Sequence, residues 1–340
     1  MINAADIVVG LAWGDEAKGK VTSHLASLKK DGAPYYDFVA RWNGGSNAGH
    51  TIYVNDVCFK THIVPCGILH GIKSIIGPNC VLNPDSFYRE LDALGSKGAD
   101  TSLVRVSPRC HIVSEQHIEY DRLNLSKKLG TTSKGIAPCY ADKAARTGVL
   151  ARDVLDEELL WDENLYGNLL CEGAQGVWLD INRGRYPWVT SSETLPYSAC
   201  SIGFPTQVIN NIYGAAKIYD TRSGEDPMFP SLLFDDRHLK QIADVGAEYG
   251  VTTGRRRKVN WLNLNYLIES INLTGTTSLL ISKCDILEEV GVYRLFYNEE
   301  LLTFVSLVDM KSFIKTSINN DCPLVEKIGF SYSAKCLGQE

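Results

Sequence analysis

The sequence predicts an α/β fold in which a mainly parallel central sheet is flanked by helices, and three observations support this prediction. Short apolar segments recur along the chain, each followed by a polar cluster and then by a loop or helical pattern. A glycine-containing loop with phosphate-binding spacing follows the first of these segments, and further polar loops follow later ones. Alternating strands and helices favour a parallel sheet covered on both faces, with ligands at the carboxyl ends of the strands.

The first strand is predicted at Asp6–Leu11 and the first helix at Lys18–Lys29, where apolar residues recur at helical spacing. The loop between them therefore precedes a helix N-terminus, which is the context that a phosphate-binding loop needs. Further strands are predicted at Ser74–Ile76, Leu103–Val106, Leu169–Cys171, Val208–Ile212 and Leu279–Ile281.

Length and composition indicate a globular enzyme. The chain has 340 residues, of which 44% are hydrophobic, so it can bury a large core. Its formal net charge of -6 argues against a general nucleic-acid or membrane binder, because a phosphate-rich partner requires a basic surface. We find no internal repeat, low-complexity tract or Pro/Ser-rich linker, which predicts one domain over residues 1–340.

The cysteines and the apolar segments indicate a cytoplasmic protein. The ten cysteines form no C-x-x-C pair and show no metal-ligand spacing, so we expect reduced and mostly buried thiols. The N-terminus lacks a basic region followed by an apolar run, and no stretch approaches the ~18 apolar residues of a membrane span.

The first polar loop, Gly14–Lys20, has the spacing of a phosphate-binding loop: a glycine, four residues and then Gly-Lys. Val21 stands where such loops carry a Ser or Thr that binds magnesium, and Asp15 and Glu16 lie inside the loop. The sequence therefore predicts a phosphate site that must obtain its metal ligand elsewhere.

Four more polar clusters are candidate ligand loops. Arg41–Thr51 contains three glycines and His50, for which a purely structural histidine is the alternative. Gly130–Gly135 carries hydroxyls suited to a phosphate but also fits an ordinary capped turn. Glu172–Gly176 directly follows a predicted strand, and Tyr186–Ser192 ends in three hydroxyls.

Two later segments indicate anion and base recognition. Val251–Lys258 contains four consecutive cations, whose repulsion favours a bound carboxylate or phosphate, with a solvated basic surface as the alternative. Ile281–Asp285 follows a predicted strand and is similar to the N/T-K-x-D loop that recognises guanine through its carboxylate.

Taken in order, these clusters resemble those of the adenylosuccinate synthetase family, from about Val8 to Ser333. The motifs are W-G-D-E-A-K-G-K, N-G-G-S-N-A-G-H-T, G-T-T-S-K-G-I-A-P, E-G-A-Q-G, Y-P-W-V-T-S-S, D-T-R-S-G, T-T-G-R-R-R and S-K-C-D. The short chain is similar to the compact archaeal and phage-encoded branch. The resemblance implies a P-loop-NTPase-like fold and a ligase that joins IMP and L-aspartate, using GTP and Mg²⁺, to give adenylosuccinate, GDP and phosphate.

The resemblance also implies catalytic roles. Asp15 is expected to remove the proton from N1 of the purine and to bind Mg²⁺ together with the carbonyl of Gly49. His50 is the expected acid, and Gln175 is expected near the reacting edge of the base. Lys18 is expected to neutralise the transferring phosphate oxygens. The residues expected around the triphosphate are Gly14, Glu16, Ala17, Lys18, Gly19, Lys20, Gly49, His50, Thr51, Lys283 and Asp285.

Two further groups of residues follow from the same resemblance. Asp15, Asn47, Thr132, Arg146, Gln175 and Thr190 correspond to contacts on the acceptor nucleotide. Arg146 matches an arginine that reaches this nucleotide from the other subunit, which implies a homodimer. Thr252, Thr253, Arg255 and Arg257 match the loop that binds L-aspartate, where arginine pairs bidentately with carboxylates.

Four positions depart from the family pattern. Ala17 replaces the usual glycine, a change that is unfavourable if the backbone there needs a positive φ. Ser46 replaces a common histidine, and the segment after Arg222 differs from the usual T-R-V-G-x-G-P-F-P. The tail Ile328–Ser333 lacks the Pro-Asp-Arg that normally closes over the donor base.

These departures keep two alternatives open. A phage branch of the family uses dGMP in place of IMP, with ATP as donor in some members. Retained Asp15 favours IMP and retained Asp285 favours GTP, whereas Ser46 and the segment after Arg222 are suited to admit dGMP. The other alternative is a non-catalytic nucleotide-binding module, which would not need the base, the acid and the aspartate-binding arginines together.

Overall fold

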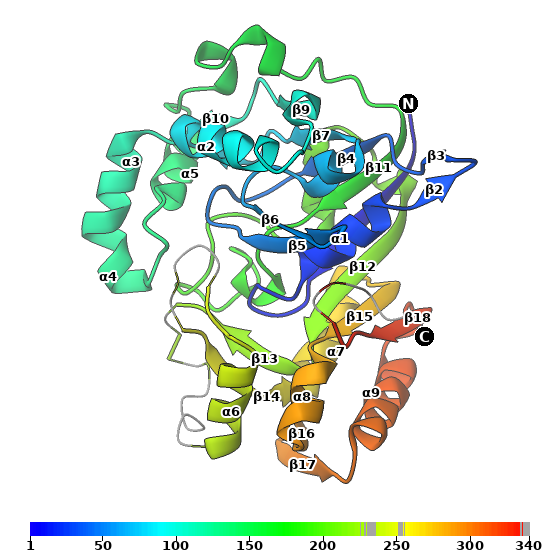
Figure 1. Cartoon of the computed structure of the whole chain (residues 1–340). Coiled ribbons are helices and arrows are strands. Elements are labelled where there is room, and N and C mark those ends of the chain that lie inside the picture. The colour runs from blue at the N-terminus through cyan, green and yellow to red at the C-terminus, as the bar shows by residue number, and fades with distance from the viewer. Residues whose placement is uncertain are drawn as a thin grey trace.

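The structure is a computed structural model of the chain, and it describes residues 1–224, 226–227, 229, 236–250, 254, 256–333 and 335. Three of the predicted aspartate-binding residues, Thr252, Thr253 and Arg255, lie outside the described residues. Figure 1 shows the chain from the N-terminal strand to the C-terminal strand. No helix in the described ranges is long and apolar enough to cross a membrane.

A parallel sheet of eight strands forms the centre of the molecule (Figure 1). Every neighbouring pair of its strands is parallel. In spatial order the strands are β18 (Lys327–Phe330), β15 (Ser278–Ser282), β12 (Ile209–Lys217), β1 (Ile2–Gly10), β11 (Gly167–Glu172), β4 (Phe38–Arg41), β7 (Lys73–Ile76) and β9 (Val104–Val106). This sheet confirms the predicted fold class.

Strand β1 shows why the sheet is covered on both faces. Its side chains alternate between the two faces, and both faces are apolar. Val8 packs in one cluster with Val21 and Leu25 of α1 (Lys18–Ala26). Ile7 belongs to the cluster that contains Leu267 of α7 (Leu264–Thr274). Helices therefore bury the sheet from opposite sides, as the strand-helix alternation predicted.

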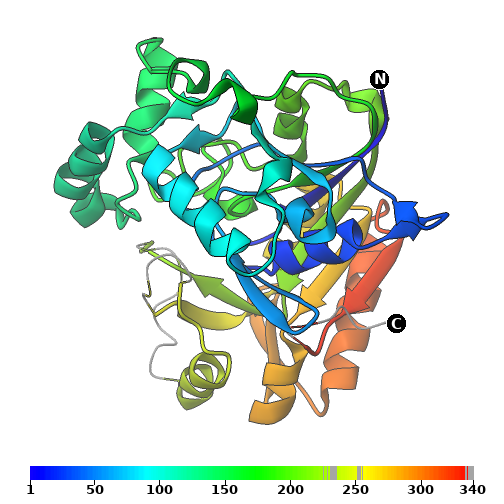
Figure 2. The same cartoon turned by 45° about the horizontal axis from the view of Figure 1, so that its top comes forward.

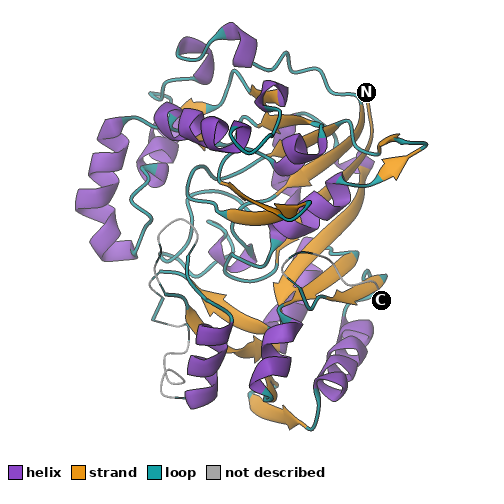
Figure 3. Cartoon of the chain, viewed as in Figure 1, coloured by secondary structure: helices purple, strands orange, loops and turns teal. Residues whose placement is uncertain are grey.

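The remaining helices lie around the central sheet and around a second sheet described below, as Figure 3 shows. Polar side chains cap several of them: Asn83 begins α2, Ser114 begins α3 and Ser306 begins α9. The helices are α2 (Pro84–Gly95), α3 (Glu115–Tyr120), α4 (Ser126–Leu129), α5 (Ile136–Ala145), α6 (Arg237–Val245), α8 (Cys284–Val290) and α9 (Leu307–Asp321). The single-turn and irregular helices are η1 (Cys66–His70), η2 (Thr101–Leu103), η3 (Asp121–Leu125), η4 (Ala151–Asp153), η5 (Glu157–Leu159), η6 (Val177–Leu179), η7 (Pro196–Ile202) and η8 (Thr206–Val208).

A second, four-stranded sheet was not predicted. Its strands are β13 (Tyr219–Arg222), β14 (Lys258–Asn263), β16 (Tyr293–Tyr297) and β17 (Glu300–Phe304). It is mixed, because β14 pairs with β16 in parallel and the outer pairs are antiparallel. With α6, α8 and α9 it forms the lower part of the molecule in Figures 1 and 2. Small pairs complete the structure: β2 (Lys29–Lys30) with β3 (Ala33–Pro34), β5 (His50–Val54) with β6 (Val57–Thr61), and β8 (Val81–Leu82) with β10 (His111–Ile112).

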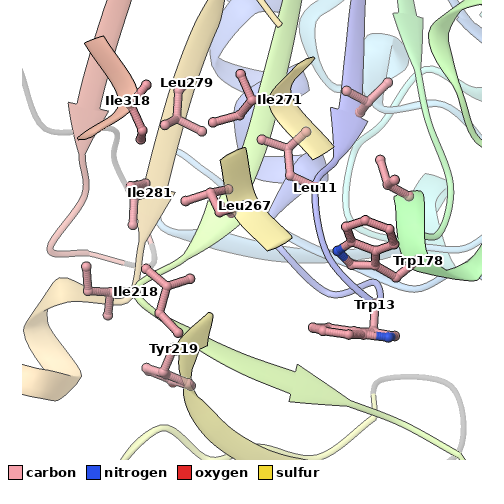
Figure 4. Close-up of a cluster of buried hydrophobic side chains, with 14 of the residues drawn as sticks. Leu11, Trp13, Trp178, Ile218, Tyr219, Leu267, Ile271, Leu279, Ile281 and Ile318 are labelled. Carbon is pink, nitrogen blue, oxygen red and sulfur yellow. The ribbon is translucent and has the colours of Figure 1, made fainter. Parts of the chain in front are cut away.

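One apolar core joins the two sheets. Figure 4 shows Leu11, directly after β1, Leu267 of α7 and Tyr219 of the second sheet within one cluster of buried side chains. Trp13, just after β1, packs beside Trp178, with ring centroids 6.4 Å apart. A single domain requires a core that both sheets share, and this core meets that requirement. The single domain itself stays a prediction.

The thiols agree with the sequence prediction over the described ranges. The cysteines there are free, and most are buried within the cores. Burial raises the pKa of several of these thiols, including Cys171 and Cys284, so they remain protonated small hydrophobes at neutral pH. Cys336 lies outside the described residues.

The backbone of Ala17 is strained. The sequence analysis expected this only if the loop needs a positive φ at that position. Its φ is 69° and its ψ is 29°, in the left-handed region that non-glycine residues adopt rarely. Asp15, two residues earlier, also has a positive φ of 62°. The first polar loop therefore needs left-handed backbone at a position where this chain carries a methyl group.

We expect Ala17→Gly to raise the free energy of unfolding by about 0.5–1 kcal/mol, because relief of left-handed strain outweighs the greater entropy of glycine in the unfolded chain. Ala141, exposed in the middle of α5, provides the control, and Ala141→Gly should lower the free energy of unfolding by about 1 kcal/mol. Chemical denaturation measures both. Destabilisation by Ala17→Gly comparable to that of the control would contradict the strain assignment.

Candidate functional site

The predicted site loops meet at the carboxyl edge of the central sheet. The loop Gly14–Lys20 follows β1, the segment with Asn47 and His50 follows β4, and Gln175 follows β11. Lys283 and Asp285 follow β15. Parallel strands end on the same edge, so loops that are far apart in sequence come together there.

Glu16 shapes the first loop from inside. Its side chain is buried, and its Oε1 accepts hydrogen bonds from the backbone N–H of Gly14 at 2.7 Å and of Ala12 at 3.1 Å. Its other oxygen pairs with Lys18. Glu16 lines neither of the two cavities described next, so within this structure it supports the loop rather than facing a ligand.

Two cavities lie at this edge. The first, which we call the Gln175 cavity, has a volume of about 200 Å³, and its lining includes Gly14, Asn47, Thr132, Gln175 and Thr190. The second, the Lys283 cavity, has a volume of about 380 Å³, and its lining includes Ala17, Gly19, Lys20, Thr51, Arg257, Lys283 and Asp285. Asp15, Lys18, Gly49 and His50 line both cavities.

The two cavities separate the predicted residues into the two groups that the sequence assigned. The described residues expected on the acceptor nucleotide lie in the Gln175 cavity, except Arg146. Those expected on the triphosphate lie mainly in the Lys283 cavity. Arg146 is exposed at the C-terminal cap of α5 and lines neither cavity.

Gln175 presents an unsatisfied acceptor. Its backbone adopts a positive φ of 58°, which re-aims the chain directly after β11. Its Oε1 is buried and accepts no hydrogen bond from the described residues. A buried amide oxygen without a partner is costly, so this oxygen is suited to a ligand N–H donor.

His50 is positioned by a buried ion pair. Its Nδ1 lies 2.7 Å from Oε1 of Glu172, and Nη2 of Arg41 donates to the same oxygen at 2.7 Å. The backbone N–H of Cys66 donates to Oε2 of Glu172 at 2.8 Å. Gly19 packs against the ring, because a Cβ there would lie 2.5 Å from Cβ of His50. These contacts hold the imidazole against the start of α1, where both cavities meet.

The ionisation of this group follows from its surroundings. Burial alone would raise the pKa of Glu172, but Arg41 and His50 outweigh it and lower the pKa to about 2. Because Glu172 is ionised at neutral pH, it accepts a hydrogen bond from Nδ1–H of His50. Burial and the charge of Arg41 lower the pKa of His50, while Glu172 acts in the opposite direction. The free protein therefore holds a neutral His50 with its Nε2 unprotonated.

Arg257 connects Asp15 to a second buried carboxylate. Its Nε donates to Oδ2 of Asp15 at 2.8 Å, and its Nη1 donates to Oε2 of Glu248 at 2.6 Å. The neighbouring Arg256 pairs with Asp244 at 2.6 Å. The protein's own carboxylates thus balance part of the basic run, so charge repulsion alone does not indicate a bound anion at these two arginines. The binding of L-aspartate by Arg257 stays a prediction.

The Mg²⁺ implied by the sequence resemblance fits the residues at the wall between the cavities. Asp15 offers a carboxylate and Gly49 a backbone carbonyl, and both line both cavities. Within the described ranges no group of three or more His, Cys, Asp or Glu side chains forms a metal cluster. A site with few protein oxygen ligands suits Mg²⁺, because this ion is commonly coordinated by one or two carboxylates together with substrate phosphates and water.

The sequence analysis missed several lining residues. Lys217, Gly246 and Tyr249 line the Lys283 cavity, and Trp13 and Trp188 line the Gln175 cavity. Lys217 ends the apolar strand β12, and a lone lysine at the end of a buried strand was the signal available for it.

The departures from the family pattern lie in different places. Ser46 is buried and lines neither cavity, whereas Ser223 and Gly224, which follow Arg222, line the Gln175 cavity. Ser333 lines the Lys283 cavity, and Lys20 donates to the backbone oxygen of Ser333 at 2.8 Å. The tail therefore reaches the predicted base-binding cavity although its motif differs.

Comparison with known proteins identifies the family of this chain. The family model described as adenylosuccinate synthetase matches residues 7–166 and 161–295. This chain belongs to the adenylosuccinate synthetase family. The adenylosuccinate synthetase of Streptococcus sanguinis is 35% identical over 347 residues, covering 85% of this chain and 79% of the relative. That of Heliobacterium modesticaldum is also 35% identical, covering 87% of this chain and 82% of the relative.

Solved structures show the same fold. A fully ligated adenylosuccinate synthetase from Plasmodium falciparum superimposes with a TM-score of 0.82 at 24% identity, covering 98% of each chain. The succinoaminodeoxyadenylate synthetase of cyanophage S-2L, bound to dGMP and to dATP as an energy donor, superimposes with a TM-score of 0.74 at 19% identity. It covers 98% of this chain and 94% of the phage protein. Nearly the whole chain thus shares the fold of these solved structures.

We predict that His50 titrates below its ordinary pKa of 6.5 in the ligand-free protein, because burial and Arg41 disfavour the imidazolium. NMR titration of labelled histidine measures this, with His50→Gln assigning the resonance. Its Nδ1 should remain protonated throughout. A pKa at or above 6.5, or a neutral ring protonated at Nε2, would contradict the arrangement with Glu172 and Arg41.

Proposed function

We propose that this protein is an adenylosuccinate synthetase, a ligase that joins IMP and L-aspartate with GTP to give adenylosuccinate, GDP and phosphate. One observation carries the proposal: Asp15, Lys18, Gly49 and His50 line both the Gln175 cavity and the Lys283 cavity. An acceptor purine in the first cavity and a triphosphate in the second would meet at these four residues.

The first step transfers the γ-phosphoryl group to the purine. Asp15 accepts the proton from N1, and the resulting charge on O6 makes that oxygen nucleophilic. O6 attacks the γ-phosphorus, the bond to the β-γ bridging oxygen breaks, and GDP leaves with 6-phosphoryl-IMP formed. Lys18 and the N–H groups at the start of α1 balance charge on the phosphate oxygens.

Several groups must change partners for this step. Asp15 accepts a hydrogen bond from Arg257 in the present structure, so its carboxylate must turn toward N1. Neutral His50 needs a second proton to act as an acid, and phosphate oxygens near Nε2 would favour its uptake. Glu172 would then stabilise the imidazolium from Nδ1.

Mg²⁺ would be held by the carboxylate of Asp15 and the carbonyl of Gly49. When bound, it would neutralise charge on the triphosphate and orient its γ-phosphoryl group. Asp15 would thereby contact the metal and the purine at once, which answers how a loop with Val21 in place of Ser or Thr serves a magnesium-dependent reaction.

The second step replaces the phosphoryl group by aspartate. The amine of L-aspartate attacks C6, the C6–O6 bond breaks, and phosphate leaves with the O6 oxygen while the nitrogen loses a proton. Arg257 is suited to bind a carboxylate of aspartate, because its guanidinium already lies between two carboxylates beside the shared wall. Thr252, Thr253 and Arg255 remain proposed partners from the sequence.

Three further parts of the proposal rest on the sequence and the residue positions. Lys283 and Asp285 recognise the donor base in the Lys283 cavity. Arg146, exposed and outside both cavities of its own chain, suits a role in the partner's site of a homodimer. We also propose that the protein acts in the cytoplasm.

A phage-type reaction with dGMP is the second candidate. The position of Ser223 and Gly224 in the Gln175 cavity is the observation that favours it. Ser46 gives it no support, since it lines neither cavity. The curated relatives at 34–35% identity carry the name adenylosuccinate synthetase, and we therefore place IMP first. A non-catalytic module would not explain why base, acid and cation share one wall.

We expect phosphate release to require IMP, L-aspartate, GTP and Mg²⁺ together, and to fall by about 10²–10⁴-fold in Asp15→Asn, which removes the general base. Asp153→Asn, at an exposed aspartate in η4, is the matched control and should retain full activity. IMP, GMP and dGMP should be crossed with GTP and ATP, and each product identified by mass.

Preferential turnover of dGMP would replace IMP by the phage-type acceptor. Phosphate release by Asp15→Asn at the rate of the unsubstituted protein would refute the assigned base. No turnover with any acceptor and donor, despite measurable nucleotide binding, would instead support the non-catalytic module.

A further inference from the structure

Glu248 lies at the centre of a buried group of charges. It is fully buried, two residues beyond the C-terminal cap of α6. Its Oε2 accepts from Nζ of Lys217 at 2.9 Å and from Nη1 of Arg257 at 2.6 Å. Its Oε1 accepts from the hydroxyl of Tyr219 at 2.7 Å and lies 3.8 Å from Nζ of Lys283. One carboxylate therefore contacts cations from three separate segments.

The charge of Glu248 is what keeps these cations together. Burial alone would raise the pKa of Glu248, but Lys217, Arg257 and Lys283 outweigh it and lower the pKa to about 2. Without the carboxylate, buried Lys217 and Arg257 would lie close together without this compensating charge, with partly exposed Lys283 beside them. Nζ of the buried Lys217 also donates to the hydroxyl of Thr221 at 2.9 Å.

Two of the three cations belong to different substrate contacts. Nη1 of Arg257 donates to Glu248, and Nε of Arg257 donates to Asp15. Glu248 therefore fixes one edge of the guanidinium, and the Nε edge points to Asp15 at the wall shared by the two cavities. Lys283 precedes Asp285 and is further fixed by a hydrogen bond to the backbone oxygen of Gly246 at 2.8 Å. Arg257, Lys217 and Lys283 all line the Lys283 cavity.

We propose that Glu248 is a positioning residue that orients Arg257 for L-aspartate and Lys283 for the donor base, and thereby couples the binding of the two substrates. This inference rests on the proposed function for the roles of Arg257 and Lys283. Both cations contact the same carboxylate. A ligand that holds one cation in place therefore also holds Glu248 in the position from which it orients the other cation. Such coupling is reciprocal, so aspartate and donor nucleotide tighten each other's binding by the same factor.

The test substitutes the carboxylate without changing its shape. In Glu248→Gln we expect the KM for aspartate and the KM for GTP each to rise by about tenfold, the factor that corresponds to one weakened charge-assisted contact, with a smaller effect on kcat. Tyr219→Phe is the matched control. It removes a hydrogen bond to the same carboxylate but leaves all three cations, and both KM values should stay within about twofold.

A double-substitution cycle distinguishes positioning from a general structural effect. If Glu248 acts through Arg257, Glu248→Gln should add little to the aspartate KM of Arg257→Leu. The same holds for the GTP KM when Glu248→Gln is combined with Lys283→Ala. Glu248→Asp, which keeps the charge but retracts it by one methylene, should show the same pattern with smaller changes and serves if Glu248→Gln does not fold.

Calorimetry measures the coupling directly. GDP binding to the unsubstituted protein should tighten in the presence of L-aspartate and Mg²⁺, and this tightening should disappear in Glu248→Gln. Unchanged KM values, additive effects in both cycles, or equal coupling in Glu248→Gln would overturn the inference. Because calorimetry needs no turnover, loss of coupling can be scored even if the proposed reaction is refuted, which keeps the two failures distinct.

Discussion

The ion pair between Glu172 and Arg41 is the interaction on which the reaction site depends. Both side chains are fully buried, and the carboxylate also contacts Nδ1 of His50 and the backbone N–H of Cys66. It therefore ties the ends of β11 and β4 to the start of the β5–β6 hairpin. Removing one partner of such a pair typically costs about 3–5 kcal/mol, because the remaining charge is buried without compensation. The position of His50 follows from this constraint.

Two other buried glutamates repeat the principle, one in the loop after β1 and one just after α6. Glu16 supports the loop after β1 by accepting from its backbone and from Lys18. Glu248 gathers Lys217, Arg257 and Lys283 beside the second cavity. None of the three lines either cavity. From behind the cavity walls, these carboxylates set the positions of Lys18, His50 and Arg257. Asp285, by contrast, is a carboxylate that lines the Lys283 cavity itself. Asp15, the predicted base, lines both cavities itself.

The first sheet was predictable because its strands are apolar on both faces. β1, β11 and β15 stand out as short apolar runs, and the glycine and hydroxyl clusters mark the loops that follow. Strand β4 (Phe38–Arg41) was not predicted because its last residue, Arg41, is charged and opens a polar cluster. Strand β13 carries Asp220 and Thr221 within a buried strand. The second sheet therefore has no clear periodic signal.

The cavity loops were likewise visible as motifs, whereas their supports were not. Glu172 meets the N–H of Cys66 across 106 positions of sequence, and Glu248 meets Lys217 across 31. Such pairs arise only when the fold brings distant segments together, and a single sequence does not reveal them. Ala17 is an intermediate case, since its cost depended on a backbone angle that the structure supplied.

The most direct test of the account follows the oxygen at C6 of the acceptor. IMP labelled with ¹⁸O at position 6 should be converted with L-aspartate, GTP and Mg²⁺, and the released phosphate examined by mass spectrometry. If O6 attacks the γ-phosphoryl group, each phosphate carries one ¹⁸O atom and the adenylosuccinate carries none from that position. Unlabelled phosphate formed together with adenylosuccinate would contradict phosphoryl transfer to O6 at the wall shared by the two cavities.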